Sequence, residues 1–448
     1  MSAQDTIVAS ATAPGRGAIS VIRLSGPNSV HIASLCCNKT LRPRYATFGS
    51  FLNASAQLDS GLWFFYPGPH SFTGEDIVEF QGHGGPVVIQ SIIEALIHAG
   101  ARLARPGEFT ERAFLNNKID LTQAEAISDL ITASSIEAVK AANRSLAGGF
   151  GQEIQSIVEQ ITHLRTHLEA HIDFPDEDIS PQALSEFGTV MTAALAYLET
   201  LLANASQGEK LNQASDIVLI GAPNAGKSSL LNALAKQPLA IVTDIPGTTR
   251  DLIRHTIVTQ GLELRITDTA GIRETENQIE QEGIQRARNA LAGADLIVCL
   301  FDEHTQDIGM NQISELLDTD NVSEPVVLIR NKIDLYDASA FKNNTPYPLV
   351  EISAKTGVGL DTLLNQMRSA LEILPREDVY LARSRHVQLL TAARGYLFAA
   401  TEQPLSHSCI DLIADDLRLA QNCLSEITGR FTSDDLLGEI FSNFCIGK

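Results

Sequence analysis

The chain has 448 residues, of which 44% are hydrophobic and 19% are charged, a composition that provides packed cores and excludes global disorder. Acidic residues outnumber basic residues by 54 to 33, and the net charge of -21 argues against a protein that coats nucleic acid non-specifically, because such binding depends on Lys and Arg. A local basic site for a folded RNA is compatible with this charge. The length predicts about three domains.

The six cysteines contain no CxxC pair, so we expect neither a zinc site nor a disulfide framework, and a reducing compartment fits better. The first residues lack a basic start followed by an apolar stretch, which argues against a signal peptide. No apolar run approaches the roughly 20 residues of a membrane-spanning helix. These features predict a soluble cytoplasmic protein with no membrane partner.

Residues 1–118 are predicted to form a mixed α+β domain. Short β-branched runs indicate strands at 6–9, 18–23, 61–66 and 76–80. The apolar stretch 86–98 indicates a helix between Gly- and Pro-rich turns.

The pattern becomes helical near Asp120. Thr122 and Glu125 have the spacing of a capping box, which predicts that a helix starts there. Further on, apolar residues recur at three- and four-residue steps, as on one face of a long helix, at Ile154, Ile157, Ile161, Leu164 and Leu168. The polar stretch 207–215 is expected to be a linker.

Strand-like and helical runs alternate from 214 to 375, which is typical of a parallel sheet. The strands are expected at 216–220, 262–267, 295–301, 326–330 and 349–352. From about residue 377 the chain is helical again. We therefore predict a discontinuous helical domain, 119–213 and 376–448, that is interrupted by an inserted α/β domain, because the ends of a doubly wound sheet lie close together.

A phosphate-binding loop is predicted between the first strand and the first helix of the inserted domain. The segment from Gly221 to Ser228 reads GAPNAGKS, which fits the P-loop pattern GxxxxGK[ST]. Glycines let backbone N–H groups wrap a phosphate, and the following helix N-terminus adds partial positive charge. Lys227 is expected to reach the β and γ phosphates, and the Ser228 hydroxyl to bind Mg²⁺.

Three further motifs follow the predicted strands. Asp268 begins DTAG and is placed to hold Mg²⁺ through water, and the Gly271 N–H to meet the γ-phosphate. Asp334, in the NKID motif, is expected to accept hydrogen bonds from N1 and N2 of guanine, which adenine does not offer. The Ser353–Lys355 segment, SAK, ends the last strand and supports the base. Together the four motifs predict a P-loop GTPase domain.

This domain resembles GTPases of the translation-factor class that are activated by potassium. The resemblance rests on Asn224 in the loop and on TDIPGTTRD, which starts at Thr243. Ile272 stands where Ras-type enzymes have a water-orienting Gln. The resemblance implies that K⁺ replaces an arginine finger, held by the Asn224 side chain, the carbonyls of Thr243 and Ile245, and Thr248.

The same resemblance implies the rest of the site. Glu280 would position the attacking water; the alternative is a solvated helix residue. Thr249 would join Ser228 and, through water, Asp268 as Mg²⁺ ligands. The expected GTP contacts are Asn224, Ala225, Gly226, Lys227, Ser228, Ser229, Thr243, Asp244, Ile245, Pro246, Gly247, Thr248, Thr249, Asp268, Thr269, Ala270, Gly271, Asn331, Lys332, Asp334, Ser353, Ala354 and Lys355.

The flanking segments resemble the MnmE (TrmE) family of tRNA-modification GTPases over essentially the whole chain. The motifs that carry this resemblance are FTGEDI from Phe72, QGHGGP from Gln81, RPGEFTERAF from Arg105 and FCIGK from Phe444. The family implies a folate-binding N-terminal domain, a homodimer, and a flavoprotein partner of the MnmG type that uses FAD and NADH and joins it in a heterotetramer or larger complex. The implied reaction places an aminomethyl or carboxymethylaminomethyl group on C5 of the tRNA wobble uridine (U34).

The family's folate contacts map onto Arg23, Glu79, Lys118 and Lys448. This charge set suits 5-formyl- or 5,10-methylene-tetrahydrofolate, because Glu79 can accept from the pteridine and the cations can meet carboxylate or formyl oxygens. Ordinary structural ion pairing is the alternative. Cys445 is a candidate catalytic thiol, or a small buried residue.

The expected tRNA surface is weakly defined. Five arginines, Arg42, Arg44, Arg102, Arg105 and Arg112, are candidates for a local RNA-facing patch, with scattered surface positions as the alternative. A second function fits the GTPase motifs: a ribosome-assembly GTPase acting as an RNA-binding switch. The folate-type N-terminal half and the terminal CIGK favour tRNA modification.

Overall fold

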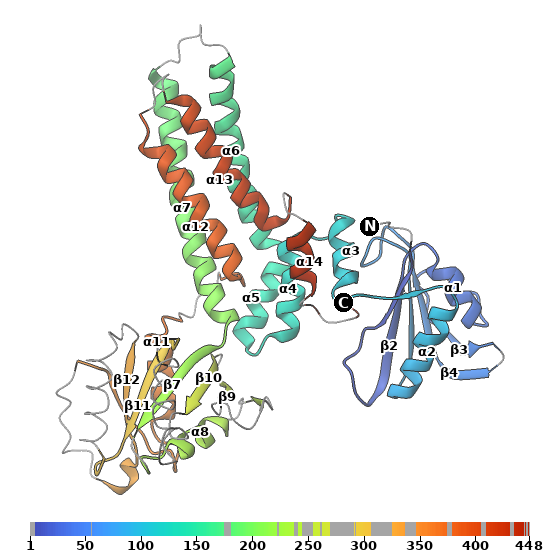
Figure 1. Cartoon of the computed structure of the whole chain (residues 1–448), viewed down its shortest axis with the longest axis horizontal. Helices are drawn as coiled ribbons and strands as arrows, with labels where there is room; N and C mark the ends of the chain where they lie inside the picture. The colour runs from blue at the N-terminus through green and yellow to red at the C-terminus, as the bar shows by residue number, and fades with distance from the viewer. Residues whose placement is uncertain are drawn as a thin grey trace, which may run out of the picture. The chain divides into compact units, whose positions relative to one another are not determined.

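The computed structural model describes residues 5–54, 56–173, 181–221, 224–236, 241–243, 254–259, 262–268, 291, 293–305, 325–336, 346–373, 379–404, 409–430, 434–442, 444 and 447. The chain forms two compact units (Figure 1). The first comprises Met1–Ile131, Ser145–Tyr197 and Leu389–Lys448, and the second comprises Thr132–Arg144 and Leu198–Gln388. The predicted domain boundaries at 118, 213 and 375 stay predictions.

The N-terminal part of the first unit is a sheet with helices packed on it, as the α+β prediction requires. Its described strands are β1 (Ile7–Ser10), β2 (Gly17–Ser25), β3 (Thr47–Asn53), β4 (Ala56–Tyr66), β5 (Ile77–Gly84) and β6 (Arg102–Leu103), in the order β3-β4-β5-β2-β1-β6. Pairing is antiparallel except between β1 and β6. The accompanying helices are α1 (Ser29–Cys36), α2 (Pro86–His98) and α3 (Glu108–Leu115).

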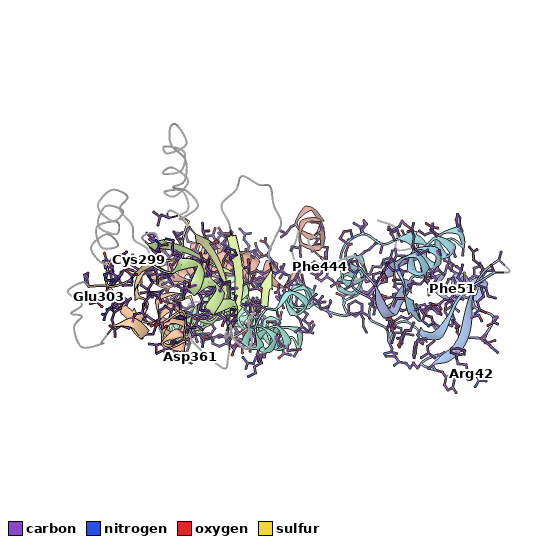
Figure 2. The ribbon with its side chains drawn as sticks, turned by 90° about the horizontal axis from the view of Figure 1, so that it is seen from below. Arg42, Phe51, Cys299, Glu303, Asp361 and Phe444 are labelled. Carbon is purple, nitrogen blue, oxygen red and sulfur yellow. The ribbon has the colours of Figure 1, made fainter. Side chains whose placement is uncertain are left out.

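Aromatic side chains fill the core under α1 and α2. The Phe51 ring stacks on Trp63 at 5.3 Å between centroids, and Phe80 lies 4.7 Å from Trp63 (Figure 2 labels Phe51). Cys36 and Cys37 are buried in the same core. Burying large aromatic rings is the main driving force here.

Helices form the rest of the first unit. Their bounds are α4 (Leu121–Thr132), α5 (Ile136–Leu146), α6 (Gly149–Asp173), α7 (Pro181–Asn212), α12 (Ser384–Glu402), α13 (Ile410–Thr428) and α14 (Asp434–Ser442), some of which extend into the second unit. The predicted apolar face of α6 is buried at all five positions. It packs on α13, where Gln421 bonds to Arg165 at 2.6 Å and to Thr162 at 3.1 Å (Figure 1).

The start of α4 corrects the predicted capping box. The helix begins at Leu121, close to the expected place, but the capping pair is Asp120 and Gln123. The Gln123 N–H donates to Asp120 Oδ1 at 2.9 Å, and the Asp120 N–H donates to Gln123 Oε1 at 3.0 Å. Thr122 instead donates its hydroxyl to Asp120. Both frames have the required three-residue spacing, and the frame that satisfies two N–H groups is the one formed.

Internal ion pairs bind α3 to the sheet. The Arg112 guanidinium is buried and pairs with Asp5 at 2.6 Å, Glu75 at 3.0 Å and Glu108 at 3.2 Å. Glu108 also accepts two hydrogen bonds from Arg102, at 3.0 and 2.7 Å. Burial raises the pKa of Glu108, but the bonds from Arg102 and from the Arg105 backbone outweigh burial and hold that pKa below its usual value. Glu108 is therefore ionised inside the fold.

Ion pairs engage three of the five arginines expected in the RNA-facing patch. Arg105 pairs with Glu111 at 2.9 Å, and Arg102 and Arg112 join the cluster around Glu108. Arg112 is buried, whereas Arg42, Arg44, Arg102 and Arg105 are exposed. The charge of Arg112 is thus satisfied within the protein, and it adds little to phosphate neutralisation. The RNA-facing patch stays a prediction for the other four.

The second unit contains the inserted sheet. Its described strands are β7 (Ser215–Gly221), β8 (Ile241–Thr243), β9 (Arg254–Thr259), β10 (Leu262–Asp268), β11 (Leu296–Phe301), β12 (Val326–Arg330) and β13 (Leu349–Glu351), in the order β13-β12-β11-β7-β10-β9-β8. The five predicted strands are present and parallel. β8 and β9 were not predicted and pair antiparallel at the edge. Helices α8 (Lys227–Ala235) and α11 (Leu360–Ala370) pack on one face.

The predicted linker 207–215 is wrong, because helix α7 continues through Asn212. Its polar residues bond to the segment that leaves the inserted domain. Lys210 pairs with Glu372 at 3.0 Å, and Ser384 donates to Glu209 at 2.5 Å. At Gly208, an added Cβ would lie 1.9 Å from the Tyr380 carbonyl oxygen. The polar composition therefore reflects a junction between two chain segments.

Replacing Glu108 with Gln tests the internal ion cluster. We expect a loss of about 3 kcal/mol at pH 7, because one partner of a buried pair is removed. The folded-state pKa of Glu108 is lowered, so its contribution to stability is present above the ordinary glutamate pKa of 4.5 and disappears as the pH falls through the folded-state pKa. Urea unfolding followed by the fluorescence of Trp63, the only tryptophan, measures this unit. The control is Glu111→Gln, which breaks the more exposed pair of Glu111 with Arg105 and should lower the free energy of unfolding by less than about 1 kcal/mol. An equal loss of unfolding free energy in the two variants at pH 7 would contradict the account.

Replacing Gly208 with Ala tests the junction. In a free helix Ala is favoured over Gly by about 1 kcal/mol, but here the new methyl group meets the Tyr380 carbonyl. We expect a lower melting temperature for Gly208→Ala. The control is Gly395→Ala in α12, where an added Cβ meets nothing within 4 Å and the melting temperature should hold or rise. Stabilisation by both substitutions would show that Gly208 is not a close-approach position.

Candidate nucleotide-binding site

The candidate residues of the second unit gather at one edge of its sheet. Parallel strands end at a common edge, and ligands of open α/β sheets bind there. The P-loop follows β7, Asp268 ends β10, Asn331 follows β12 and Ser353 follows β13. The structure thus brings together motifs that are more than 100 residues apart in sequence.

The P-loop depends on glycine at two positions. A Cβ at Gly221 would lie 2.2 Å from the Leu300 carbonyl oxygen of the neighbouring strand. Gly226 has φ of +106°, and a Cβ there would lie 2.2 Å from the Asn331 amide nitrogen. Asn224 also has positive φ, at 65°, a conformation that Asn tolerates better than most residues. Gly221 and Gly226 therefore lie tightly against the neighbouring strand β11 and the loop after β12.

Lys227 is buried at the start of α8. Its Nζ donates to the Gly221 carbonyl at 2.6 Å, so the side chain lies back over its own loop. Ser228 and Ser229, which follow it, are exposed. Cys299 of β11 lies within the sheet (Figure 2). Burial raises the pKa of the Cys299 thiol to about 12, against the opposing charge of Lys227, so this cysteine is a neutral core residue.

The Asn331 side chain joins the P-loop to the last loop of the sheet. Asn331 is 2% exposed. Its Nδ2 donates to the Ala225 carbonyl at 2.9 Å, and its Oδ1 accepts from the Ala354 N–H at 3.0 Å. One buried amide therefore fixes the loops after β7, β12 and β13 relative to one another.

Lys332 makes a second link to the P-loop. It has φ of +66°, and its Nζ donates to the Asn224 carbonyl at 2.8 Å and pairs with Asp302 at 2.5 Å. Burial raises the pKa of Asp302, but hydrogen bonds from Lys332 and Thr305 outweigh burial and lower that pKa. The pair is charged and holds the lysine against the loop.

The Asp334 carboxylate is oriented by the SAK segment. The Ser353 hydroxyl donates to Asp334 Oδ1 at 2.6 Å, and the Thr356 N–H in turn donates to the Ser353 hydroxyl at 3.2 Å. Asp334 lies in a short 3₁₀ helix, Ile333–Leu335. These two hydrogen bonds hold the Asp334 carboxylate in one orientation. A carboxylate that recognises hydrogen-bond donors needs such a fixed orientation.

Two contributing residues were not predicted. Asp302 follows β11 and anchors Lys332, and Arg330 ends β12, where it is buried and pairs with Glu351 at 2.7 Å and Glu303 at 3.2 Å (Figure 2 labels Glu303). A charged residue directly after a fully apolar strand was the available signal for Asp302.

Some predicted residues lie outside the described part of the chain. These are Asp244, Ile245, Pro246, Gly247, Thr248, Thr249, Thr269, Ala270, Gly271, Ile272, Glu280, Cys445 and Lys448. Thr243 and Asp268 are described by their backbone alone. The geometry above therefore concerns the loop and the base-side corner.

The predicted folate residues of the first unit lie near one loop. Arg23 pairs with Glu79 at 2.8 Å, so the ion pairing given as the alternative is present. The Arg23 guanidinium also lies 5.6 Å from the Phe72 ring centroid and 5.8 Å from that of Phe109. Lys118 donates to the Pro69 carbonyl at 3.0 Å. Residues 69–72 of the β4–β5 loop thus contact both cations.

Burial and charge also act on the tyrosine beside this pair. The pKa of Tyr66 is raised, chiefly by burial and then by the charge of Glu79. Tyr66 stacks on Phe64 with 6.3 Å between centroids. Aromatic rings, one cation and one anion are therefore combined at this end of β4 and β5.

Two protein-family models match this chain. The model for the GTP-binding protein TrmE N-terminus matches residues 6–118, and the model for the MnmE helical domain matches residues 121–445. The G domain of the T. maritima FeoB iron transporter matches 35% of this chain and 99% of its own at 24% identity, with a TM-score of 0.28. Among the described residues, no helix combines the length and apolarity needed to cross a bilayer.

Three relatives that match along nearly their whole length are named tRNA modification GTPase MnmE. The tRNA modification GTPase MnmE of Saccharophagus degradans is 47% identical over 99% of both chains, and that of Legionella pneumophila (strain Corby) is also 47% identical over 99% of both. The Coxiella burnetii protein of that name is 44% identical over 99% of both chains. With two family models and this coverage, the chain belongs to the MnmE family of tRNA modification GTPases.

Proposed function

We propose that the chain is the GTP-hydrolysing subunit of a cytoplasmic complex that modifies C5 of the tRNA wobble uridine, U34. The product group is aminomethyl or carboxymethylaminomethyl, with one carbon from a tetrahydrofolate derivative. The observation that carries the proposal is the family match across both the N-terminal region and the helical region that contains the GTPase domain. A match at 6–118 favours modification over ribosome assembly, because a bare GTPase switch does not require that domain.

Phosphate binding is assigned to the P-loop and its helix. The N-terminus of α8 and the glycine-rich backbone suit a nucleotide phosphate. Lys227 already lies over the loop, and a short side-chain movement would let it meet the β and γ phosphates. Ser228, Thr249 and, through water, Asp268 would hold Mg²⁺, which takes oxygen ligands.

Hydrolysis is assigned to a potassium-dependent arrangement. Asn224, Thr243, Ile245 and Thr248 would hold K⁺, which supplies positive charge between the β and γ phosphates, and Glu280 would position the attacking water. Two G domains of a homodimer would approach one another in this step. The Asn224 carbonyl is held by Lys332 at 2.8 Å, which supports a preset orientation of this part of the loop.

Guanine selection is assigned to Asp334. A carboxylate held by Ser353 at 2.6 Å would accept from N1 and N2 of guanine, and Lys332 and Ala354 would flank the base. Adenine offers neither donor, and a polar site left unpaired discriminates by up to about 10⁴.

One-carbon binding is assigned to the first unit. Arg23, Glu79 and Lys118, with Lys448, would hold 5-formyl- or 5,10-methylene-tetrahydrofolate, and the rings of Phe72 and Phe109 beside Arg23 suit a flat pteridine. Glu79 would then give up part of its ion pair with Arg23 and accept hydrogen bonds from the pteridine instead. Cys445 is retained as a candidate catalytic thiol.

The proposed partners are a second copy of the chain, tRNA, and an MnmG-type flavoprotein that brings FAD and NADH in a heterotetramer or larger complex. The internal pairing of Arg102, Arg105 and Arg112 supports a division of labour in which the flavoprotein supplies most of the tRNA-binding surface. The described cysteines are free thiols, in keeping with a reducing compartment.

Replacing Asp334 with Asn tests base recognition. The variant should bind GTP roughly 100-fold more weakly, because two charge-assisted hydrogen bonds are lost. It should bind xanthosine triphosphate better than wild type does, because xanthine offers a carbonyl at C2 that an amide can meet. Competition against a fluorescent nucleotide measures both affinities. Asp361→Asn, which removes one carboxylate at the start of α11, is the control, and unchanged selectivity in Asp334→Asn would refute the assignment.

Exchanging K⁺ for Na⁺ tests the hydrolytic site. GTP turnover should slow by roughly tenfold or more, because the smaller ion fits the same oxygen cage poorly. Nucleotide affinity should change little, since the cation acts mainly on the transition state. Steady-state phosphate release and nucleotide binding are measured in the two salts at equal ionic strength. Equal turnover in both salts would remove K⁺ from the mechanism.

A further inference from the structure

Helix α6 carries three histidines at four-residue intervals. His163, His167 and His171 therefore lie on one side of the helix, outside both sites described above. His163 and His167 are exposed, and His171 is half-buried. The first two contact one another directly: their ring centroids are 4.5 Å apart.

The Nε2 atoms of the two exposed imidazoles face one another. The His163 Nε2 to His167 Nε2 distance is 3.3 Å, which is within hydrogen-bonding range when one of the two nitrogens is protonated. Two nitrogens bound tetrahedrally to one Zn²⁺ at 2.0–2.1 Å would be about 3.3–3.4 Å apart. The pair is thus already spaced as the two ligands of one metal ion.

The surroundings suit a partly hydrated ion. His163 and His167 line a hollow of about 560 Å³, together with Glu159, Thr162, Thr166 and Gln421. Glu159 lies one helical turn before His163 and brings negative charge. Arg430 also lines the hollow and brings positive charge. The hollow is large enough for the waters that complete a coordination sphere.

The third histidine has another role. The Nδ1 atom of His171 lies 2.7 Å from the His167 carbonyl oxygen, and its ring packs edge-on against Phe187 of α7, 6.4 Å between centroids. Phe187 also lies 6.0 Å from the His167 ring. These contacts fix the ring of His171 against the helix and make it a matched control on the same face.

We propose that His163 and His167 chelate a borderline divalent transition-metal ion, of which Zn²⁺ is the type, through their two Nε2 atoms. Imidazole is a preferred ligand for such ions. Among the described residues no group of three or more His, Cys, Asp or Glu is placed to hold a metal, so water fills the remaining positions. The site is separate from the Mg²⁺ site, because Mg²⁺ selects oxygen ligands.

Zinc titration of the full chain by calorimetry, in excess Mg²⁺, tests the proposal. Wild type should bind one more Zn²⁺ per chain than the His163→Gln/His167→Gln variant does. Each single variant should weaken this site by roughly tenfold or more, about 1.4 kcal/mol. His171→Gln should bind as wild type does. Identical isotherms for wild type and the double variant would overturn the proposal.

A residue-specific measurement separates this site from metal held by cysteines. Diethyl pyrocarbonate modifies uncoordinated histidine nitrogens, and mass spectrometry locates the modified residues. Zn²⁺ should protect His163 and His167 at least severalfold, and His171 should be unaffected. Protection that is equal at all three, or absent at the first two, would overturn the chelate. GTP hydrolysis by the double variant without Zn²⁺ should match wild type, because neither histidine belongs to the nucleotide site.

Discussion

The nucleotide site depends on one buried amide. Asn331 donates from Nδ2 to the P-loop carbonyl of Ala225 and accepts at Oδ1 from the N–H of Ala354. The P-loop and the loop after β13 are therefore held to the same side chain. Leaving such buried groups unpaired costs about 1–3 kcal/mol each. Gly226 is required beside it, because any side chain would displace the amide. The corner around Asp334, to which we assign guanine selection, is therefore linked to the P-loop.

Several arginines of the first unit are paired with carboxylates of the same unit. Its arginines near α3 stabilise the fold: Arg112 joins Asp5, Glu75 and Glu108 in one buried cluster. Arg23 likewise pairs with Glu79. We infer that these charges organise the N-terminal domain and its ligand site, and that contact with the tRNA backbone depends largely on the partner protein.

Sequence patterns predicted the parts whose residues act locally. Strands β7, β10, β12 and β13 were found because each is a short apolar run before a polar motif. β11 was found as an apolar run in the same alternating pattern, and the buried face of α6 because its period is regular. Residues 207–215 were misassigned because their polarity serves contacts with residues 371–384, which composition does not reveal. The burial of Arg112 was missed for the same reason, because its partners Asp5 and Glu75 are distant in sequence. Asp302 was missed because its partner Lys332 is likewise known only from the fold.

The most direct test of the account is mass spectrometry of wobble nucleosides in tRNA from cells that lack this chain. The account predicts that the C5 modification of U34 disappears, that the wild-type chain restores it, and that Lys227→Ala does not, since that variant lacks the phosphate-binding lysine. Intact modification in the deletion strain, or full restoration by Lys227→Ala, would contradict the link between the nucleotide site and modification of tRNA.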